Sequence, residues 1–133
     1  MKAVFADTYF YLGLLNRRDA AHPRVVRAMR QLAAPVLTTA WVVTEVADAM
    51  ASPVHRVDFA RFFDALVRDP NVTTIPPSEE LFLRGLQLYA DRRDKEWSLT
   101  DCISFIVMQD EGLIDALTAD RHFEQAGFRA LLA

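Results

Sequence analysis

Four acidic side chains stand in otherwise apolar sequence, and they are the residues of this 133-residue chain best suited to chemistry. They are Asp7, Glu45, Asp101 and Asp120. Lone carboxylates are rarely buried without a partner, and no recurring lysine or arginine accompanies these four to neutralise them. If the fold gathers them, the natural counter-charge is a hard divalent cation, which prefers oxygen ligands. That is the chemistry of a metal-dependent nuclease.

Two of these acids are expected at the same edge of a sheet. Asp7 ends the apolar run 3–6, and Asp120 follows a strand expected over 114–118. In open parallel sheets, ligands bind beyond the carboxyl ends of the strands. Asp115 competes as the fourth acid, but it lies inside its strand, so we prefer Asp120.

The other two acids lie in segments that are poorly suited to solvent. Asp101 opens a nearly all-apolar helix expected over 99–110, which should be the most buried of the chain, and Glu45 is flanked by valines in the helix expected over 41–50. Two carboxylates ~5 Å apart at an effective dielectric of ~20 repel by about 3 kcal/mol. Several such pairs would require a cation among them.

Each acid also has a purely structural explanation. Asp7 and Asp120 stand where a strand leads into a helix, and aspartate is a preferred N-cap. Ser98 and Asp101 have the spacing of a capping box, and a carboxylate in a first helical turn is stabilised by the helix dipole. Glu45 could lie on a solvent-facing helix surface. The sequence leaves both explanations open, because it does not show whether the four acids converge.

The composition indicates a globular, cytoplasmic protein. Hydrophobic residues make up 52% of the chain, with only 4 Gly and 6 Pro. Its one cysteine, Cys102, excludes an internal disulfide and is expected in the core. No stretch approaches the ~20 apolar residues of a membrane span, and the start lacks a secretory pattern. His22, His55 and His122 lack ligand spacing with one another, so a zinc site is not expected.

The charge pattern bears on nucleic-acid binding. A net charge of −3 argues against a broad, nonspecific coating of nucleic acid, but arginines are locally enriched. They are candidates for phosphate contacts at the rim of a site, or they are simply solvated helix faces. These residues are Arg17, Arg18, Arg24, Arg27, Arg30, Arg92, Arg93 and Lys95.

Short apolar strands alternate with longer helical stretches. Strands are expected over 3–6, 36–39, 72–75, 114–118 and 128–132, and helices over 8–15, 22–33, 41–50, 54–67, 79–91, 99–110 and 121–125. Gly112 is a predicted C-cap. Strands separated by helices require crossovers, which favours a parallel sheet covered on both faces. We therefore predict a three-layer α/β/α sandwich with a central, mostly parallel sheet, in one domain spanning 1–133.

The order of the acidic motifs resembles that of the PIN-domain ribonucleases. The resemblance spans essentially the whole chain, and short members of this size are often VapC-type toxins of bacterial type II toxin–antitoxin pairs. All four acids of the pattern are present. The segments that carry it are Val4-Phe5-Ala6-Asp7-Thr8, Thr44-Glu45-Val46-Ala47, Trp97-Ser98-Leu99-Thr100-Asp101-Cys102 and Leu117-Thr118-Ala119-Asp120-Arg121-His122-Phe123, followed by Ala126-Gly127-Phe128.

The resemblance implies that Asp7, Glu45, Asp101 and Asp120 form a site for Mg²⁺, with Mn²⁺ as a substitute. Asp7 and Asp101 are the expected direct ligands, and the other two bind directly or through water. The metal would activate a water for in-line attack on a phosphodiester, and Glu45 is a candidate to orient or deprotonate that water. Hydroxyls near the acids are candidates for positioning them or for capping helices: Thr8, Ser98 and Thr100.

The implied function is that of a Mg²⁺-dependent endoribonuclease toxin with RNA as substrate. The implied partners are a cognate antitoxin that blocks the site and a second copy of the chain in a homodimer. Met50 and the aromatic residues of the helices expected over 41–50 and 54–67 could serve the dimer contact or the core. The alternatives are a noncatalytic protein-binding module that keeps the acids as helix caps, and a DNA-directed nuclease of the same architecture.

Overall fold

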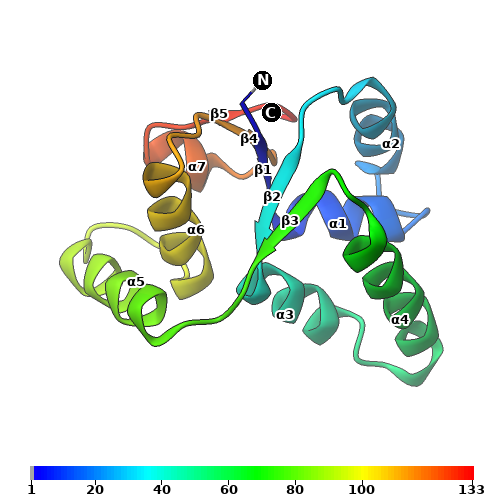
Figure 1. Ribbon diagram of the computed structural model, residues 1–133, viewed down its shortest axis with the longest axis horizontal. Coiled ribbons are helices and arrows are strands. Elements are labelled where there is room, and N and C mark those ends of the chain that lie inside the picture. The colour runs from blue at the N-terminus through cyan, green and yellow to red at the C-terminus, as the bar shows by residue number, and fades with distance from the viewer. Residues whose placement is uncertain (1) are drawn as a thin grey trace.

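The computed structural model describes residues 2–133, which form a sheet of five strands surrounded by seven helices (Figure 1). The strands are β1 (Val4–Ala6), β2 (Val36–Thr39), β3 (Val72–Ile75), β4 (Asp115–Leu117) and β5 (Arg129–Ala130). The helices are α1 (Thr8–Leu15), α2 (His22–Gln31), α3 (Ala40–Ala49), α4 (Pro53–Arg68), α5 (Glu79–Asp91), α6 (Leu99–Asp110) and α7 (Arg121–Gln125).

Every neighbouring pair of strands in the sheet is parallel, in the order β3-β2-β1-β4-β5. Helices α5, α6 and α7 lie on one side of the sheet, and α1, α2 and α4 lie on the other (Figure 1). The predicted three-layer α/β/α sandwich is confirmed. The sheet is wholly parallel over the described residues because each connection between paired strands includes at least one helix.

The strand order creates a crevice at the centre of the sheet. After β1 the chain moves outward through β2 to β3, and it then returns to the other side of β1 to form β4 and β5. The order therefore reverses between β1 and β4, and open α/β sheets bind ligands beyond the carboxyl ends of the strands at such a point. Asp7 directly follows β1, and Asp120 lies three residues beyond the end of β4.

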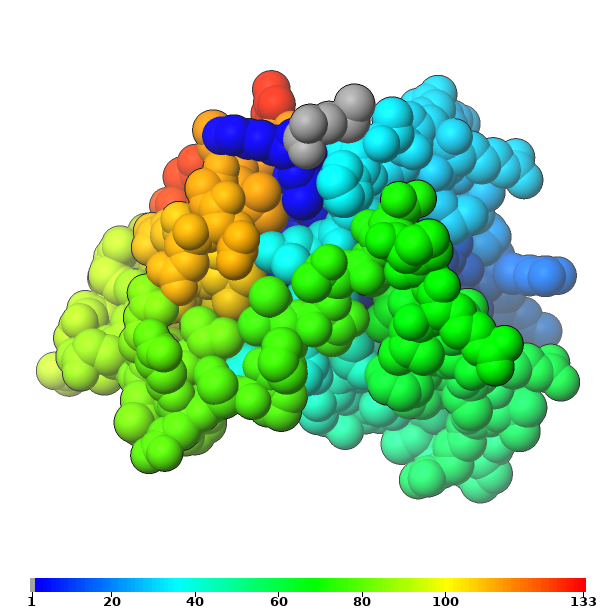
Figure 2. Space-filling model, in the orientation of Figure 1, coloured from blue at the N-terminus to red at the C-terminus, as the bar shows by residue number. Residues whose placement is uncertain are grey.

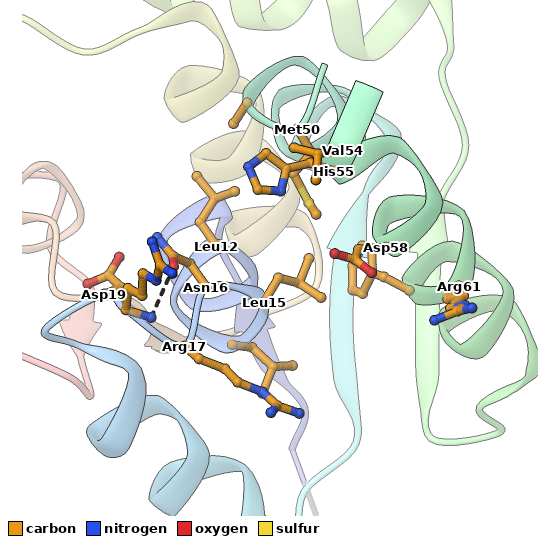
Figure 3. Close-up of a pocket in the computed structure, with 14 residues that line it drawn as sticks. Leu12, Leu15, Asn16, Arg17, Asp19, Met50, Val54, His55, Asp58 and Arg61 are labelled. Carbon is orange, nitrogen blue, oxygen red and sulfur yellow. Dashed lines mark hydrogen bonds between the residues drawn. The ribbon is translucent and has the colours of Figure 1, made fainter. Parts of the chain in front are cut away.

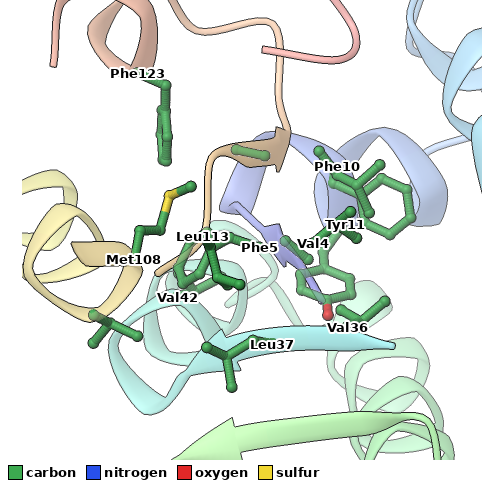
Figure 4. Packing of buried hydrophobic residues seen from close by; sticks show 14 of the residues in the cluster. Val4, Phe5, Phe10, Tyr11, Val36, Leu37, Val42, Met108, Leu113 and Phe123 are labelled. Atoms are coloured by element: carbon green, nitrogen blue, oxygen red, sulfur yellow. The ribbon is translucent and has the colours of Figure 1, made fainter. Parts of the chain in front are cut away.

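Helix α6 is the most buried helix, as its apolar sequence predicts. Seven of its twelve residues are buried, and none of the other helices has more than three buried residues among those described. Phe105 of α6 packs edge-on against Phe123 of α7, with ring centroids 5.0 Å apart. Figure 4 shows Phe123 and Met108 on one side of β1 and Phe10 on the other, so the core continues through the sheet. Full burial of each such side chain contributes about 1.5–3 kcal/mol.

The ends of several elements differ by one or two residues from the prediction, and the local structure explains these differences. Helix α3 begins one residue early because the Thr39 hydroxyl accepts the backbone N–H of Val42 at 3.1 Å. Helix α2 stops at Gln31 because Leu32 is already extended, with φ −73° and ψ 118°. Strand β5 is shorter than the predicted 128–132, since its neighbour β4 has only three residues. Among the described helices, none is both long and apolar enough to cross a bilayer.

Gly112 ends α6 as predicted. Its φ of +66° lies in the left-handed region that favours glycine. The Gly112 N–H donates to the Gln109 carbonyl at 3.1 Å, and the Leu113 N–H donates to the Met108 carbonyl at 2.8 Å. These two bonds form a Schellman motif, which satisfies the last carbonyls of the helix and turns the chain toward β4.

The contact between α5 and α6 yields a stability prediction. A Cβ atom added at Gly85 would overlap the Ile103 side chain. We expect Gly85→Ala to lower the free energy of unfolding by about 1–3 kcal/mol, although alanine is the better helix former. Urea unfolding measures this, and the cost should largely disappear in an Ile103→Ala background. A Gly85→Ala protein as stable as the wild type would contradict this close packing.

Candidate active site

The four acids meet in a cleft at the carboxyl edge of the sheet. The cleft has a volume of about 450 Å³ and lies where the start of α1, the middle of α3 and the first turns of α6 and α7 come together. The structure thus brings together all four acids singled out in the sequence. The residues that line the cleft are Asp7, Thr8, Tyr9, Glu45, Glu96, Ser98, Asp101, Ala119, Asp120 and His122.

Asp7 is the most deeply buried acid of the cleft, with 5% of its surface exposed. Burial raises its pKa from 3.8 to about 7, the Thr118 hydroxyl and the Thr8 backbone oppose this by hydrogen bonding, and the charges of Asp101 and Glu45 add to the rise. The Thr118 hydroxyl donates to Asp7 Oδ2 at 3.0 Å. The Asp7 side chain accepts no hydrogen bond from the N2 or N3 backbone of α1, as an N-cap would, so capping does not explain its burial. Ionised Asp7 requires a compensating positive charge.

Asp101 and Asp120 cap helices and also line the cleft. Oδ2 of Asp101 accepts the Ser98 N–H at 3.1 Å, and the Ser98 hydroxyl accepts the Asp101 N–H at 3.0 Å, which completes a capping box. Oδ1 of Asp120 accepts the His122 N–H at 2.9 Å. Among the described residues, neither Asp101 Oδ1 nor Asp120 Oδ2 has a hydrogen-bond donor. Capping therefore leaves one oxygen of each carboxylate free for a ligand.

Glu45 is half-buried on α3 and is held by a hydroxyl on α1. Thr8 Oγ1 donates to Glu45 Oε1 at 2.5 Å, so Thr8 positions this acid, one of the roles suggested by the sequence. Ser98 serves as the cap of α6. Thr100 is absent from the lining of the cleft, and its carbonyl accepts the Ser104 hydroxyl at 2.9 Å.

Asp115 lies outside the cleft, in agreement with the preference for Asp120. It pairs with Arg129 of β5 through two hydrogen bonds of 2.7 and 3.0 Å. Its charge is thus compensated within the sheet. Cys102, next to Asp101, is fully buried in the core, and burial raises the pKa of its thiol to about 11.

His122 is the site residue that the sequence interpretation missed. Its Nδ1 lies 2.9 Å from Asp101 Oδ2 and 3.5 Å from Asp120 Oδ1. Carboxylates only accept hydrogen bonds, so this nitrogen acts as the donor. Asp101, Asp120 and His122 each offer one atom within 4.8 Å of the others. Spacing between histidines carried no signal, but the position of His122 two residues after Asp120 could have revealed it.

The cleft is strongly acidic. None of the described residues that line it is a lysine or an arginine. Four of the arginines expected at its rim line other hollows: Arg17 and Arg18 line a second cleft, and Arg27 and Arg30 line a hollow on α2. Arg92 pairs with Asp94 at 3.0 Å and covers the Trp97 ring. A cluster of carboxylates without local cations, beside one imidazole, fits a hard divalent cation.

A second, larger cleft of about 1150 Å³ lies between α1, the end of α3 and α4 (Figure 3). Figure 3 shows Leu12 and Leu15 facing the side of Met50, with Arg17 and Arg61 at the edges. Met50 is 7% exposed and packs in the core, which is one of the two roles that the sequence suggested for it; the other was a dimer contact. The cleft therefore combines an apolar floor with a charged rim.

Comparisons with known proteins agree with this geometry. The family model described as PIN domain matches residues 4–129. A solved structure of Mycobacterium tuberculosis VapC20, described as a toxin that cleaves the sarcin–ricin loop, superposes with a TM-score of 0.87 at 25% identity, covering 97% of this chain and 98% of that one. FitAcB from Neisseria gonorrhoeae has the same fold, with a TM-score of 0.68 at 21% identity, covering 96% and 95%. A comparison with curated protein sequences gives no significant match.

The raised pKa of Asp7 predicts a pH-dependent stability of the metal-free protein. Because the folded pKa of about 7 exceeds 3.8, the folded state holds an extra proton between these values, and the free energy of unfolding falls as the pH rises from about 4 to about 7. Asp7→Asn removes this loss, so the variant should be more stable than the wild type at pH 8 by about 2–4 kcal/mol. Urea unfolding in EDTA measures the difference.

The advantage of Asp7→Asn should shrink as the pH falls toward about 3, where Asp7 is mostly protonated in both the folded and the unfolded state. Asp115→Asn is the matched control, since it removes a carboxylate that pairs with Arg129, and it should not stabilise the protein at pH 8. An effect of Asp7→Asn that is constant across the pH range would contradict the buried, protonated state of Asp7.

Proposed function

This chain belongs to the PIN-domain family, and we propose from its site that it is a divalent-metal-dependent endoribonuclease acting as the toxin of a type II toxin–antitoxin pair. The observation that carries the proposal is the convergence of four carboxylates at the β1–β4 crevice, with no lysine or arginine among the described lining residues. Such a site suits metal-assisted phosphodiester hydrolysis, because an anionic substrate can approach these acids closely only through an intervening cation.

We assign the metal to Asp7, Glu45, Asp101 and Asp120, with Mg²⁺ as the physiological ion and Mn²⁺ as a substitute. Their oxygens are the ligands that both ions accept, and burial of Asp7 makes compensation of its charge favourable. When bound, the ion would activate a water and offset charge on the phosphoryl oxygens. Asp7 and Asp101 are the direct ligands in this assignment.

The side chains around the acids fix their orientation. Thr8 holds Glu45 half-buried at the cleft, where its carboxylate can take a proton from the attacking water. Thr118 holds one oxygen of Asp7, and His122 holds one oxygen of Asp101. Each acid is thus held on one oxygen while the other remains available. This arrangement reduces the reorganisation needed when substrate binds.

RNA is the proposed substrate. The likeness to VapC20, a toxin described as cleaving the sarcin–ricin loop, supports RNA and makes that stem-loop the first substrate to test. A DNA oligonucleotide of the same sequence separates ribonuclease from DNA-directed activity. A protein that binds partners but cleaves neither substrate would be the noncatalytic module in which the acids act as caps.

We propose a cognate antitoxin as partner and assign its docking to the larger cleft. The apolar floor and charged rim of that cleft suit an amphipathic segment, which lays its apolar side into such a groove. A homodimer is supported by apolar side chains exposed on α4: Val57 at 57%, Phe63 at 42% and Val67 at 59%. Large exposed apolar surfaces commonly mark protein contacts.

We further propose that residues 1–133 act as one domain in the cytoplasm. The buried hydrophobic residues of the described chain form a continuous cluster that includes all layers of the fold. The only cysteine is buried and free, which suits a reducing compartment.

The acid assignment predicts which substitutions abolish cleavage. Asp101→Asn keeps an oxygen for the capping box but removes the ligand charge, so we expect cleavage of the RNA to fall at least about 100-fold. EDTA should abolish wild-type activity, and Mn²⁺ or Mg²⁺ should restore it. Asp115→Asn, which changes an acid outside the cleft, should retain activity. Growth arrest on induction of the wild type but not of Asp101→Asn tests the toxin role.

Full RNA cleavage by folded Asp7→Asn and Asp101→Asn proteins would overturn the metal assignment. Equal loss of activity in Asp115→Asn would show that the effect is not specific to the cleft.

The position of His122 predicts an effect on metal affinity. Removing a donor that orients a ligand commonly weakens metal binding by about 10–100-fold. We therefore expect His122→Ala to weaken Mn²⁺ binding by at least about 10-fold, measured by titration of the RNA-free protein. His122→Asn, whose amide can still donate, should bind more tightly than His122→Ala. His55→Ala, in the other cleft, should have no effect, and unchanged affinity in His122→Ala would refute this role.

A further inference from the structure

Five arginines near the beginning of the chain form a surface that the acidic cleft does not use. They are exposed in the turn after α1 and along α2, and we call them the arginine face: Arg17, Arg18, Arg24, Arg27 and Arg30. In Figure 1, α2 lies beside α1, on the side of the sheet opposite α5, α6 and α7. Figure 2 shows the neighbouring α2 surface open to solvent at the edge of the molecule, in the light-blue part of the colour range.

The charges of the arginine face are not compensated by the protein. Over the described residues, none of the five forms an ion pair, whereas six other cationic side chains do. Arg24 donates a hydrogen bond to the Leu132 carbonyl at 2.7 Å, which holds its side chain but does not neutralise its charge. Residues 16–31 contain these five arginines and one acid, Asp19, which gives a charge of +4. The rest of the chain has ten basic and 17 acidic residues, so its charge is −7. The overall charge of −3 conceals a strong separation.

The helical period concentrates the charge on one side of α2. Arg24, Arg27 and Arg30 are three residues apart, so at ~100° per residue they spread over about 120° of the helix surface. Val25, fully buried, lies on the opposite side. A hollow of about 490 Å³ opens on this side of the helix, with His22, Arg27 and Arg30 among its lining residues. The side chains therefore present a concave, cationic surface.

We propose that the arginine face binds backbone phosphates of the RNA substrate at a distance from the cleaved bond. This inference rests on the proposed function. The guanidinium group matches a phosphate bidentately, and neutralised phosphates release counterions, which favours binding. Helix α1 has eight residues and spans ~12 Å, so the face begins about that far from Asp7. A single folded RNA can reach both places.

A phosphate backbone fits this surface better than a protein does. The core of a protein interface is apolar and depleted of charge. Residues 16–31 contain no Phe, Tyr or Trp, and the one large hydrophobic side chain exposed among them is Met29, at 43%. The apolar floor of the larger cleft is the better protein site, and Arg17 and Arg18 stand at the edge where that cleft borders the arginine face. The arginine face would also offset the repulsion that the acidic cleft exerts on an approaching polyanion.

The test compares two variants that remove the same number of charges. Arg27→Gln/Arg30→Gln alters the face, and these side chains make no hydrogen bond or ion pair with the described protein, so the fold should tolerate the change. Arg68→Gln/Arg84→Gln is the control on α4 and α5. Both pairs are placed in an Asp101→Asn background, and binding to the sarcin–ricin stem-loop is measured in EDTA over a range of salt concentrations by fluorescence anisotropy.

We expect the Arg27/Arg30 variant to bind about 10-fold more weakly at low salt, and the slope of log affinity against log salt to fall by about 1.4–1.8. The control pair should match the parent protein. In the active enzyme, the same variant should raise KM for the RNA and leave kcat unchanged. Equal affinity and equal salt slope in the two variants would overturn the proposal that the arginine face binds RNA phosphates.

The outcomes separate this inference from the proposed function. RNA cleavage by the wild type with no effect of the Arg27/Arg30 change refutes the face alone. Salt-dependent RNA binding through Arg27 and Arg30, without cleavage by the wild type, supports the face and refutes the nuclease. Absence of both binding and cleavage refutes both. Weaker binding of an acidic protein partner with unchanged RNA binding would assign the surface to protein and overturn the proposal.

Discussion

The burial of Asp7 at the end of the central strand is the constraint on which the rest of the site depends. A carboxylate in this position loses its hydration, and its neighbours Glu45 and Asp101 are also acidic. The fold supplies a hydroxyl from Thr118 but no lysine or arginine among the described lining residues. The charge of ionised Asp7 therefore has to be balanced by a proton or a cation, so proton binding and the proposed metal binding would compete at this residue.

Helix capping and metal binding are compatible in this fold because a carboxylate has two oxygens. Asp101 and Asp120 each use one oxygen to cap a helix, and the cap fixes the direction of the other. Helix capping was the structural explanation for these two acids, and the same caps orient their free oxygens toward the cleft. The parallel sheet also contributes to the site, because the helices that follow parallel strands begin at the same edge of the sheet. Local stability and site geometry arise from the same bonds.

Charge is divided between elements of this protein. Acids gather at the carboxyl ends of β1 and β4, while unpaired arginines gather on α2 and the turn before it. A metal-free acidic cleft repels a polyanion, whereas the exposed arginines would attract one. Net charge averages over both regions and describes neither. Arg17, Arg18, Arg27 and Arg30 line other hollows because they stand after α1 and along α2, not at the strand ends.

Local signals in the sequence determined most of the elements and the identity of the four acids. The helices 8–15 and 99–110 and the strands 36–39 and 72–75 have the predicted bounds, since caps, prolines and Gly112 act over a few residues. Tertiary structure decided the rest. The strand order, the β1–β4 crevice, the Thr118–Asp7 hydrogen bond and the place of His122 join residues up to 111 positions apart. Such contacts depend on how the whole chain crosses over and packs, and apart from the place of His122 near Asp120, no short stretch of sequence encodes them.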